Sequence, residues 1–257
     1  MALPLMIRSA EREAIVWSRI WRSGAFSTFV APVLMLVAMG VGLGELVDEG
    51  TSDVAGLDYL AFVTPGLMMG AVVQGAAGNS MWPVMAGHRW LGYHRAAVSS
   101  PMSAADVFGG QVLWTAAKAC LQAAVFLAAG VALGGVDSWW AVTTVPLAAL
   151  AALSFAAPLS AFAATQDSDA AFEVILRVGV MPLYLFSGTL FPVEDLPVVL
   201  GAITRLFPLW HAVEVARAAT TGTGSAPAVV GHLAVLVAFA AAGWWWGGRT
   251  FARRLTP

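Results

Sequence analysis

The chain has 257 residues, of which 59% are hydrophobic and only 11% carry a charged side chain. Soluble domains contain about 25% charged residues, so this composition excludes an ordinary soluble globular protein. The formal net charge of −2 gives no excess of positive charge for a nucleic-acid partner, and none is expected. We therefore predict an all-α polytopic membrane protein that is embedded in membrane lipid.

Residues 7–22 predict an amphipathic helix in the cytoplasmic membrane interface. Ile7, Ala14 and Trp21 are seven residues apart and share one helix face, while the arginines fall largely elsewhere around the helix. The alternative interpretation is a plain positively charged flank of the first span. The segment has neither the apolar run nor the cleavage site of a signal peptide.

Six mostly apolar runs follow, each of the length that a helix needs to cross a bilayer. They cover residues 24–44, 59–82, 104–134, 139–163, 171–190 and 228–248. Each run far exceeds the ~10 alternating residues of a membrane β-strand. We therefore expect six transmembrane helices within a single transmembrane domain, residues 1–257.

The basic residues predict that both termini are cytoplasmic, by the positive-inside rule. With that orientation the inside segments carry Arg8, Arg12, Arg19, Arg22, Arg89, Arg95, Arg177, Arg249, Arg253 and Arg254. Only Arg205 and Arg217 fall outside. The first outside loop contains Glu45, Asp48, Glu49, Asp53 and Asp58 without a basic residue.

Residues 83–101 form the longest internal cytoplasmic segment. It is rich in aromatic and cationic residues and contains Gly87, His88, Arg89, Trp90, Leu91, Tyr93 and Arg95. A short helix of this kind could dock in a groove on a soluble partner. From the residues alone, a connecting loop whose Trp and Tyr anchor at the lipid headgroups is an equally good interpretation.

Residues 191–227 contain two short apolar pieces, neither of which is long enough to span. Asp195 before Pro197 fits a helix start, and Pro208 would end that helix. We expect short re-entrant helices that dip into the outer leaflet, because a long exposed loop would leave apolar side chains in water.

A polar stripe crosses the third expected span. Gln111, Thr115, Lys118 and Gln122 recur at spacings of four, three and four residues, which places them on one face. Counted from Ser103, Lys118 lies about 22 Å along the helix, past the bilayer midplane. A lysine there is costly unless it faces protein or water. The stripe lines a translocation path in one interpretation; in the other it hydrogen-bonds to neighbouring spans, or Lys118 extends outward.

Sequence motifs for catalysis are absent. The only lysine, Lys118, follows Ala117, so the chain has no phosphate-binding Gly-Lys loop. The single cysteine, Cys120, and four histidines that are not spaced like a zinc pair predict no metal site. Four G-x-x-x-G pairs, at Gly40/Gly44, Gly66/Gly70, Gly130/Gly134 and Gly243/Gly247, are little more than chance predicts and indicate helix packing at most.

Several motifs together resemble one transporter family. The most specific is Phe186-Ser187-Gly188-Thr189-Leu190-Phe191-Pro192 followed by Leu196-Pro197; Pro65-Gly66, Ser100-Pro101, Trp114 with Lys118, and Pro208 to Glu214 with Arg217 support it. Over nearly its whole length the chain resembles the type-2 ATP-binding-cassette (ABC) exporter permeases. The nodulation-factor export permeases (NodJ-like) and the daunorubicin-resistance permeases are the most similar groups.

This resemblance implies a permease in the inner membrane of a bacterium that dimerises with an identical or related copy. It also implies two copies of a separate ATPase, which would bind ATP and Mg²⁺, so that this chain needs no cofactor and is not itself an enzyme. Residues 87–95 would be the coupling helix, and the re-entrant helices would follow Phe191. Substrates of such relatives are amphipathic lipid-, glycolipid- or drug-like molecules.

Two other functions compete with this interpretation. An ion-coupled secondary transporter would place ionisable residues near the midplane of several spans, where only Lys118 qualifies. A membrane-embedded lipid-modifying enzyme would need clustered carboxylates. Asp167, Asp169 and Glu173 do cluster, but capping of the fifth helix by Ser168 or Asp169 is a simpler explanation.

Overall fold

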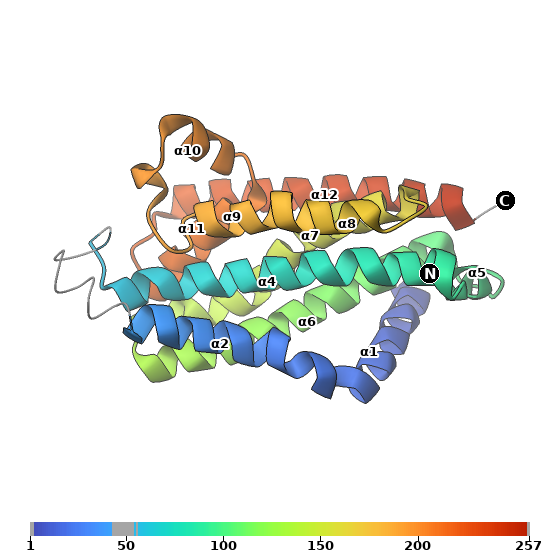
Figure 1. Cartoon of the computed structure of the whole chain (residues 1–257), viewed down its shortest axis with the longest axis horizontal. Coiled ribbons are helices and arrows are strands. Elements are labelled where there is room, and N and C mark those ends of the chain that lie inside the picture. Colours follow the sequence, from blue (N-terminus) through green and yellow to red (C-terminus); the bar gives the residue numbers. More distant parts are fainter. Residues whose placement is uncertain (1–2, 43–53, 55, 256–257) are drawn as a thin grey trace.

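The computed structural model describes residues 3–42, 54 and 56–255. Within these residues the chain is almost entirely helical, apart from turns and a single isolated β-bridge between Val54 and Leu57. Most of the long helices lie side by side along one long axis, while α1 (Leu3–Ala25) crosses it (Figure 1). We call the end near Trp90, α5 (Tyr93–Val98) and Leu255 the α5 end, and the end near Tyr59 and α10 (Val198–Thr204) the α10 end.

The predicted N-terminal helix is present as α1, Leu3–Ala25. It is followed without a break by η1 (Phe26–Val30), α2 (Ala31–Leu36) and η2 (Val37–Gly42), where η1 and η2 have π-helical hydrogen bonding. The part from Leu5 to Arg22 makes an angle of 90° with the part from Phe26 to Gly40. This bend separates α1 from the first span and fits a helix that lies across the bundle. The end of the expected span 24–44 and most of the acidic loop that follows lie outside the described residues.

The second span is longer than expected. Helix α4 runs from Tyr59 to Met85 and continues as the π-helical segment η3, Ala86–Trp90. The helix therefore continues past the expected span boundary at residue 82, because the first half of the segment 83–101 extends it. The chain turns at Gly92, whose φ of +68° suits a residue without a side chain, and enters the short helix α5, Tyr93–Val98.

Helix α6 (Ala104–Leu133) agrees with the third expected span. It begins with a capping box, in which the Ser103 hydroxyl accepts from the Asp106 N–H and the Asp106 carboxylate accepts from the Ser103 N–H at 2.9 Å. The fourth span is formed by η4, Trp139–Thr143, and α7, Thr144–Thr165.

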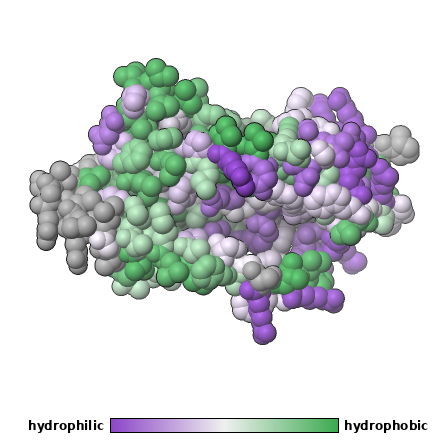
Figure 2. Space-filling model, viewed as in Figure 1, coloured by the Kyte–Doolittle hydropathy of each residue, from purple (hydrophilic) through white to green (hydrophobic). Residues whose placement is uncertain are grey.

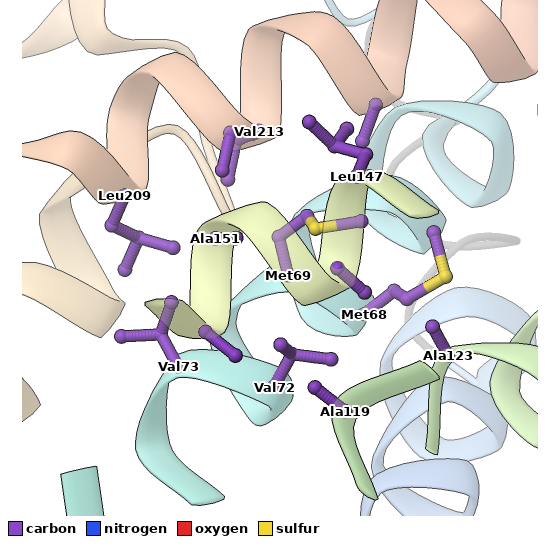
Figure 3. Close-up of a cluster of buried hydrophobic side chains, with 14 of the residues drawn as sticks. Met68, Met69, Val72, Val73, Ala119, Ala123, Leu147, Ala151, Leu209 and Val213 are labelled. Carbon is purple, nitrogen blue, oxygen red and sulfur yellow. The ribbon is translucent and has the colours of Figure 1, made fainter. Parts of the chain in front are cut away.

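Helix α7 lies at the centre of the bundle, packed against α4, α6, α11 and α12. Its contact face is rich in alanine, which lets neighbouring helices approach closely. Figure 3 shows one end of this core, where Met69 and Val73 of α4 meet Ala151 of α7, and Leu209 and Val213 of α11. The core is thus built from the spans and from α11, which the sequence predicts to lie outside them.

The fifth expected span consists of three consecutive helical segments. They are α8 (Ala170–Val174), η5 (Ile175–Val180) and α9 (Met181–Phe186), of five, six and six residues. This helix ends at Phe186, before the expected boundary at residue 190, because the backbone turns at Ser187 and Gly188 has a φ of +74°. It is slightly shorter than a typical spanning helix.

Short helices follow, as expected for residues 191–227. They are η6 (Val193–Asp195), α10 (Val198–Thr204) and α11 (Pro208–Thr221), with α10 and α11 bent by 83° relative to each other. The last span, α12, covers Ala226–Leu255 and extends beyond both expected boundaries.

By length and composition, the described residues contain four helices that could cross a membrane, or up to six if each bent pair counts as one span. Figure 2 shows that hydrophilic side chains gather at the α5 end, while much of the remaining visible surface is apolar. The chain is therefore an all-α, multi-pass membrane protein.

Two of the G-x-x-x-G pairs mark close helix contacts. A Cβ on Gly66 would lie 2.5 Å from the carbonyl oxygen of Thr189, and one on Gly70 would clash with the Tyr184 ring. In α12, Gly243 faces Pro158 of α7, and Gly247 faces the Phe108 ring. These glycines are required by packing, as the sequence indicated.

Candidate functional site

The α5 end presents an exposed tip between α4 and α5. The Trp90 side chain is 56% exposed and Leu91 is 74% exposed, and Arg89 and Arg95 are exposed beside them. Large apolar side chains at a solvated helix end are typical of a docking surface. Of the seven residues predicted for coupling, these four are available to a partner.

The other three predicted coupling residues support the tip from within. Gly87 is buried against the His94 imidazole, and His88 is buried with its Nδ1 2.9 Å from Nδ1 of His94. The Tyr93 hydroxyl donates to the Pro83 carbonyl at 3.1 Å, and the Arg12 guanidinium lies 3.7 Å above the Tyr93 ring. These contacts fix α5 against α4 and α1.

His94 is held in its neutral form. Burial above all, together with the nearby His88 and Arg12, lowers the pKa of His94 to about 3. On its other side, the His94 ring lies beside the Phe251 ring of α12, at a centroid distance of 5.9 Å. A neutral imidazole therefore fills the space beneath the tip.

An ion-pair bridge joins three elements at the α5 end. Arg89 of η3 and Arg254 of α12 both donate to the same carboxylate oxygen of Asp167, which lies between α7 and α8. The hydrogen bond from Arg254, followed by the charge of Arg89, lowers the pKa of Asp167. Sequence reasoning missed this bridge, because its members are separated by 78 and 87 residues.

The sequence suggested that Ser168 or Asp169 caps the fifth helix with its side chain, and this was wrong. Asp169 does occupy the N-cap position of α8, but its side chain makes no capping hydrogen bond. Asp167 forms the bridge, and Glu173 pairs with Arg177 one turn further along at 3.0 Å. Two of the three acidic residues of the cluster, Asp167 and Glu173, are therefore explained by ion pairs.

Three of the four stripe residues line one continuous groove. Thr115, Lys118 and Gln122 face a narrow gap of about 30 Å³ between α6, α4 and α1. The Lys118 ammonium donates to the Asn79 side-chain oxygen at 2.6 Å. Gln111 instead faces a separate cavity of about 130 Å³ beside Arg8, and its buried amide atoms have no partner among the described residues.

The depth expected for Lys118 conflicts with the position expected for α1. Trp17 of α1 packs edge-on against Trp114, with ring centroids 5.9 Å apart. Trp114 precedes Lys118 by one helical turn, or about 6 Å. The two expectations therefore exclude each other: with α1 in the membrane interface, Lys118 lies near that level and not past the midplane.

The motif after α9 is anchored to α4 and α11. Ser187 is fully buried, and the Gly188 carbonyl accepts a hydrogen bond from Arg217 of α11 at 2.5 Å. The Arg217 guanidinium also pairs with Glu214 at 2.5 Å and lies 4.1 Å above the Phe62 ring. The motif after α9 and helix α11 therefore form one unit with the first turns of α4.

The remaining motif residues shape the approach to α10. Phe191 packs against Phe186 with ring centroids 6.3 Å apart, and Pro192 is the N-cap residue of η6. The Leu196 N–H donates to the Val193 carbonyl at 3.2 Å, and the Pro197 carbonyl accepts from the Gly201 N–H at 3.0 Å. All six predicted motif residues thus belong to one contiguous structure.

A multi-pass helical chain with one exposed docking tip and a polar groove has the organisation of a membrane transport subunit. The profile of the ABC-2 type transporter family matches residues 6–220, and the chain belongs to this family. It is thus a permease subunit of the ABC exporter type, and the resemblance to NodJ-like permeases is confirmed.

Its relatives include several proteins called "Nodulation protein J". The one from Rhizobium meliloti is 25% identical over 96% of this chain and 92% of its own length. The one from Neorhizobium galegae is 26% identical over 88% and 84%, respectively. The one from Bradyrhizobium diazoefficiens is 24% identical over 95% and 91%. These matches cover nearly the entire chain.

Proposed function

We propose that this permease moves an amphipathic lipid-, glycolipid- or drug-like substrate outward across the cytoplasmic membrane of a bacterium. Hydrolysis of ATP, with Mg²⁺, takes place on a separate ABC ATPase present in two copies. A second permease copy, identical or related, completes the translocation pathway. Family membership and the paucity of charge in the spans support an amphipathic cargo.

The observation that carries the coupling part of this proposal is the exposed tip at Trp90 and Leu91. Together these side chains offer an apolar knob flanked by the cations Arg89 and Arg95, suited to a groove on a soluble partner. The Asp167 bridge orients Arg89, so that Arg89 positions the tip as well as flanking it.

The same surface supports a cytoplasmic location for the α5 end and for both termini. Arg89 and Arg254 meet there at Asp167, Arg95 lies in α5, and Arg253 lies in the last turn of α12, as the positive-inside rule requires. Figure 2 shows hydrophilic side chains gathered at this end. The α10 end then faces outward, and α10 with α11 forms the re-entrant pair in the outer leaflet.

The test is co-purification of the tagged permease with ABC ATPases from the same genome, in wild type and in a Trp90→Ala/Leu91→Ala variant. We expect the variant to lose affinity by about 30-fold or more, since truncating a central interface anchor costs about 2 kcal/mol or more. Trp245→Ala is the matched control. Trp245 is also a large exposed side chain, 62% exposed, but it lies in the C-terminal part of α12, outside the tip.

Equal retention of the ATPase by the tip variant and by wild type would refute the assignment of the coupling surface. Flux that is driven by a proton gradient in vesicles without any ATPase would refute the ATP-driven exporter. Both measurements use the full chain, and size-exclusion chromatography checks that each variant is folded.

A further inference from the structure

A groove runs between the N-terminal helices and the α4–α6 pair. Two chambers of about 270 Å³ each and the narrow gap beside Lys118 lie along it. Asn79 lines both chambers and the gap, so the three spaces are neighbours. One chamber lies next to α1; the other lies beside η1 and α2.

The chamber next to α1 combines charge with an apolar wall. Lys118, Arg12 and Glu13 line it together with Trp17 and Trp114. On α1, Val16 and Ile20 also face it and are 42% and 57% exposed. Such a wall suits an acyl chain, whereas the charged residues require a polar group.

The charges of this chamber do not balance. The Arg12 guanidinium pairs with the Glu13 carboxylate at 2.5 Å, so these two charges neutralise each other. The partner of Lys118 is the neutral amide of Asn79, and no carboxylate of the described residues lies within ion-pairing distance of its ammonium; the charge of Glu13, already paired with Arg12, acts on it only through space. One positive charge is therefore left over in this chamber, where it is available to an anionic group.

Lys118 is one turn from the Trp17–Trp114 contact, so its ammonium lies close to the level of α1. With α1 in the membrane interface, as the sequence predicts, that level is the interfacial plane. Lipid phosphates occupy that plane, and basic pockets between helices on the cytoplasmic side bind anionic headgroups.

We propose that this groove binds an amphiphile of the inner leaflet that has a monoanionic phosphodiester headgroup. Lys118 and Asn79 contact the phosphate, the two tryptophans flank the headgroup, and the acyl chains lie against Val16 and Ile20. The inference goes beyond the proposed function, because it concerns binding by the permease alone and requires neither an ATPase nor transport.

The test is equilibrium binding of a short-chain, fluorescently labelled phosphatidylglycerol to the purified permease in detergent. Unlabelled phosphatidylglycerol should compete about tenfold better than phosphatidylcholine of the same chain length, the factor expected for one charge-assisted hydrogen bond. Lys118→Met should abolish this preference, while Lys118→Arg should retain it. Arg249→Met, which removes a cation over the Trp245 ring outside the groove, is the matched control and should also retain it.

Equal competition by the two lipids on wild-type protein would overturn the proposal, and this comparison holds even if Lys118→Met fails to fold. Loss of the preference in Arg249→Met to the same degree would also overturn it, since a general surface charge would then be responsible. Competition by soluble glycerol 3-phosphate as strong as that by phosphatidylglycerol would show a free-phosphate site and refute the lipid.

Discussion

A single methyl group tests the contact between α4 and the motif after α9. Gly66→Ala would place a Cβ 2.5 Å from the Thr189 carbonyl oxygen and 2.6 Å from the Thr189 Cα. Ordinary contacts of a Cβ begin near 3.4 Å, so the backbone at Thr189 would have to move by nearly 1 Å. That backbone is held by Arg217 at Gly188 and by a hydrogen bond from the Thr189 hydroxyl to the Tyr184 carbonyl.

The expected cost has two parts. Overpacking against an anchored backbone destabilises by about 1–3 kcal/mol, and here the upper part of that range applies. Replacing glycine by alanine inside a helix stabilises the fold by about 0.5–1 kcal/mol, which offsets part of this loss. We therefore expect Gly66→Ala to lower the free energy of unfolding by about 2 kcal/mol.

Gly78→Ala is the matched control on the same helix, because no atom lies within 4 Å of its added Cβ. It should be neutral or raise the free energy of unfolding by about 0.5–1 kcal/mol. Unfolding of the purified protein by SDS in mixed micelles, followed by tryptophan fluorescence, measures both variants. If Gly66→Ala is as stable as Gly78→Ala, the close contact between α4 and Thr189 is refuted.

Three further perturbations probe the anchors at the two ends. Arg217→Gln leaves Glu214 without its ion-pair partner and the Gly188 carbonyl without its donor, and should destabilise by about 2–4 kcal/mol in the same SDS titration; unchanged stability would contradict the anchoring role. The lowered pKa of His94 means that its contribution to stability is full above the unfolded pKa of about 6.5 and falls on acidification, by about 2 kcal/mol between pH 7 and pH 5. Burial lowers the pKa of His88 to about 4, so His88 adds a fall of its own, and His94→Phe should reduce the pH dependence without abolishing it; an unchanged pH dependence in this variant would show that His94 is not responsible. Arg254→Gln removes the largest cause of the lowered pKa of Asp167, so this pKa should rise toward its ordinary value in carboxyl-carbon NMR, and a titration identical to wild type would exclude the bridge.

The hydropathy of the sequence was sufficient to recognise an all-α multi-pass membrane protein, because burial in lipid is a property of local composition. It was also sufficient for the start of α6, where Ser103 and Asp106 cap the helix. It failed at residue 82, since the charged and aromatic residues that follow suggested a loop. Hydrogen bonding continues the helix to Trp90, and the shift to π-helical geometry in η3 has no hydropathy signal.

The details of the candidate site depended on pairings that no local pattern contains. His88 and His94 could be recognised as a pair only after the turn at Gly92 had folded one onto the other. Asp167 is indistinguishable in sequence from a capping residue until α12 brings Arg254 beside it. Local reasoning did identify the stripe around Lys118, because residues on one helix face follow from periodicity alone.

The uninterrupted helix from Tyr59 to Trp90 has a mechanical consequence. Its 32 residues form a strut of about 48 Å, which contains both the exposed Trp90 and Gly66, the glycine that touches Thr189. A displacement of Trp90 along this strut is transmitted to the motif after α9, at the α10 end, without passing through a loop. Pro65 and Pro83, which lack the N–H of the helical ladder, are the two points at which such a strut would yield first, one near each end.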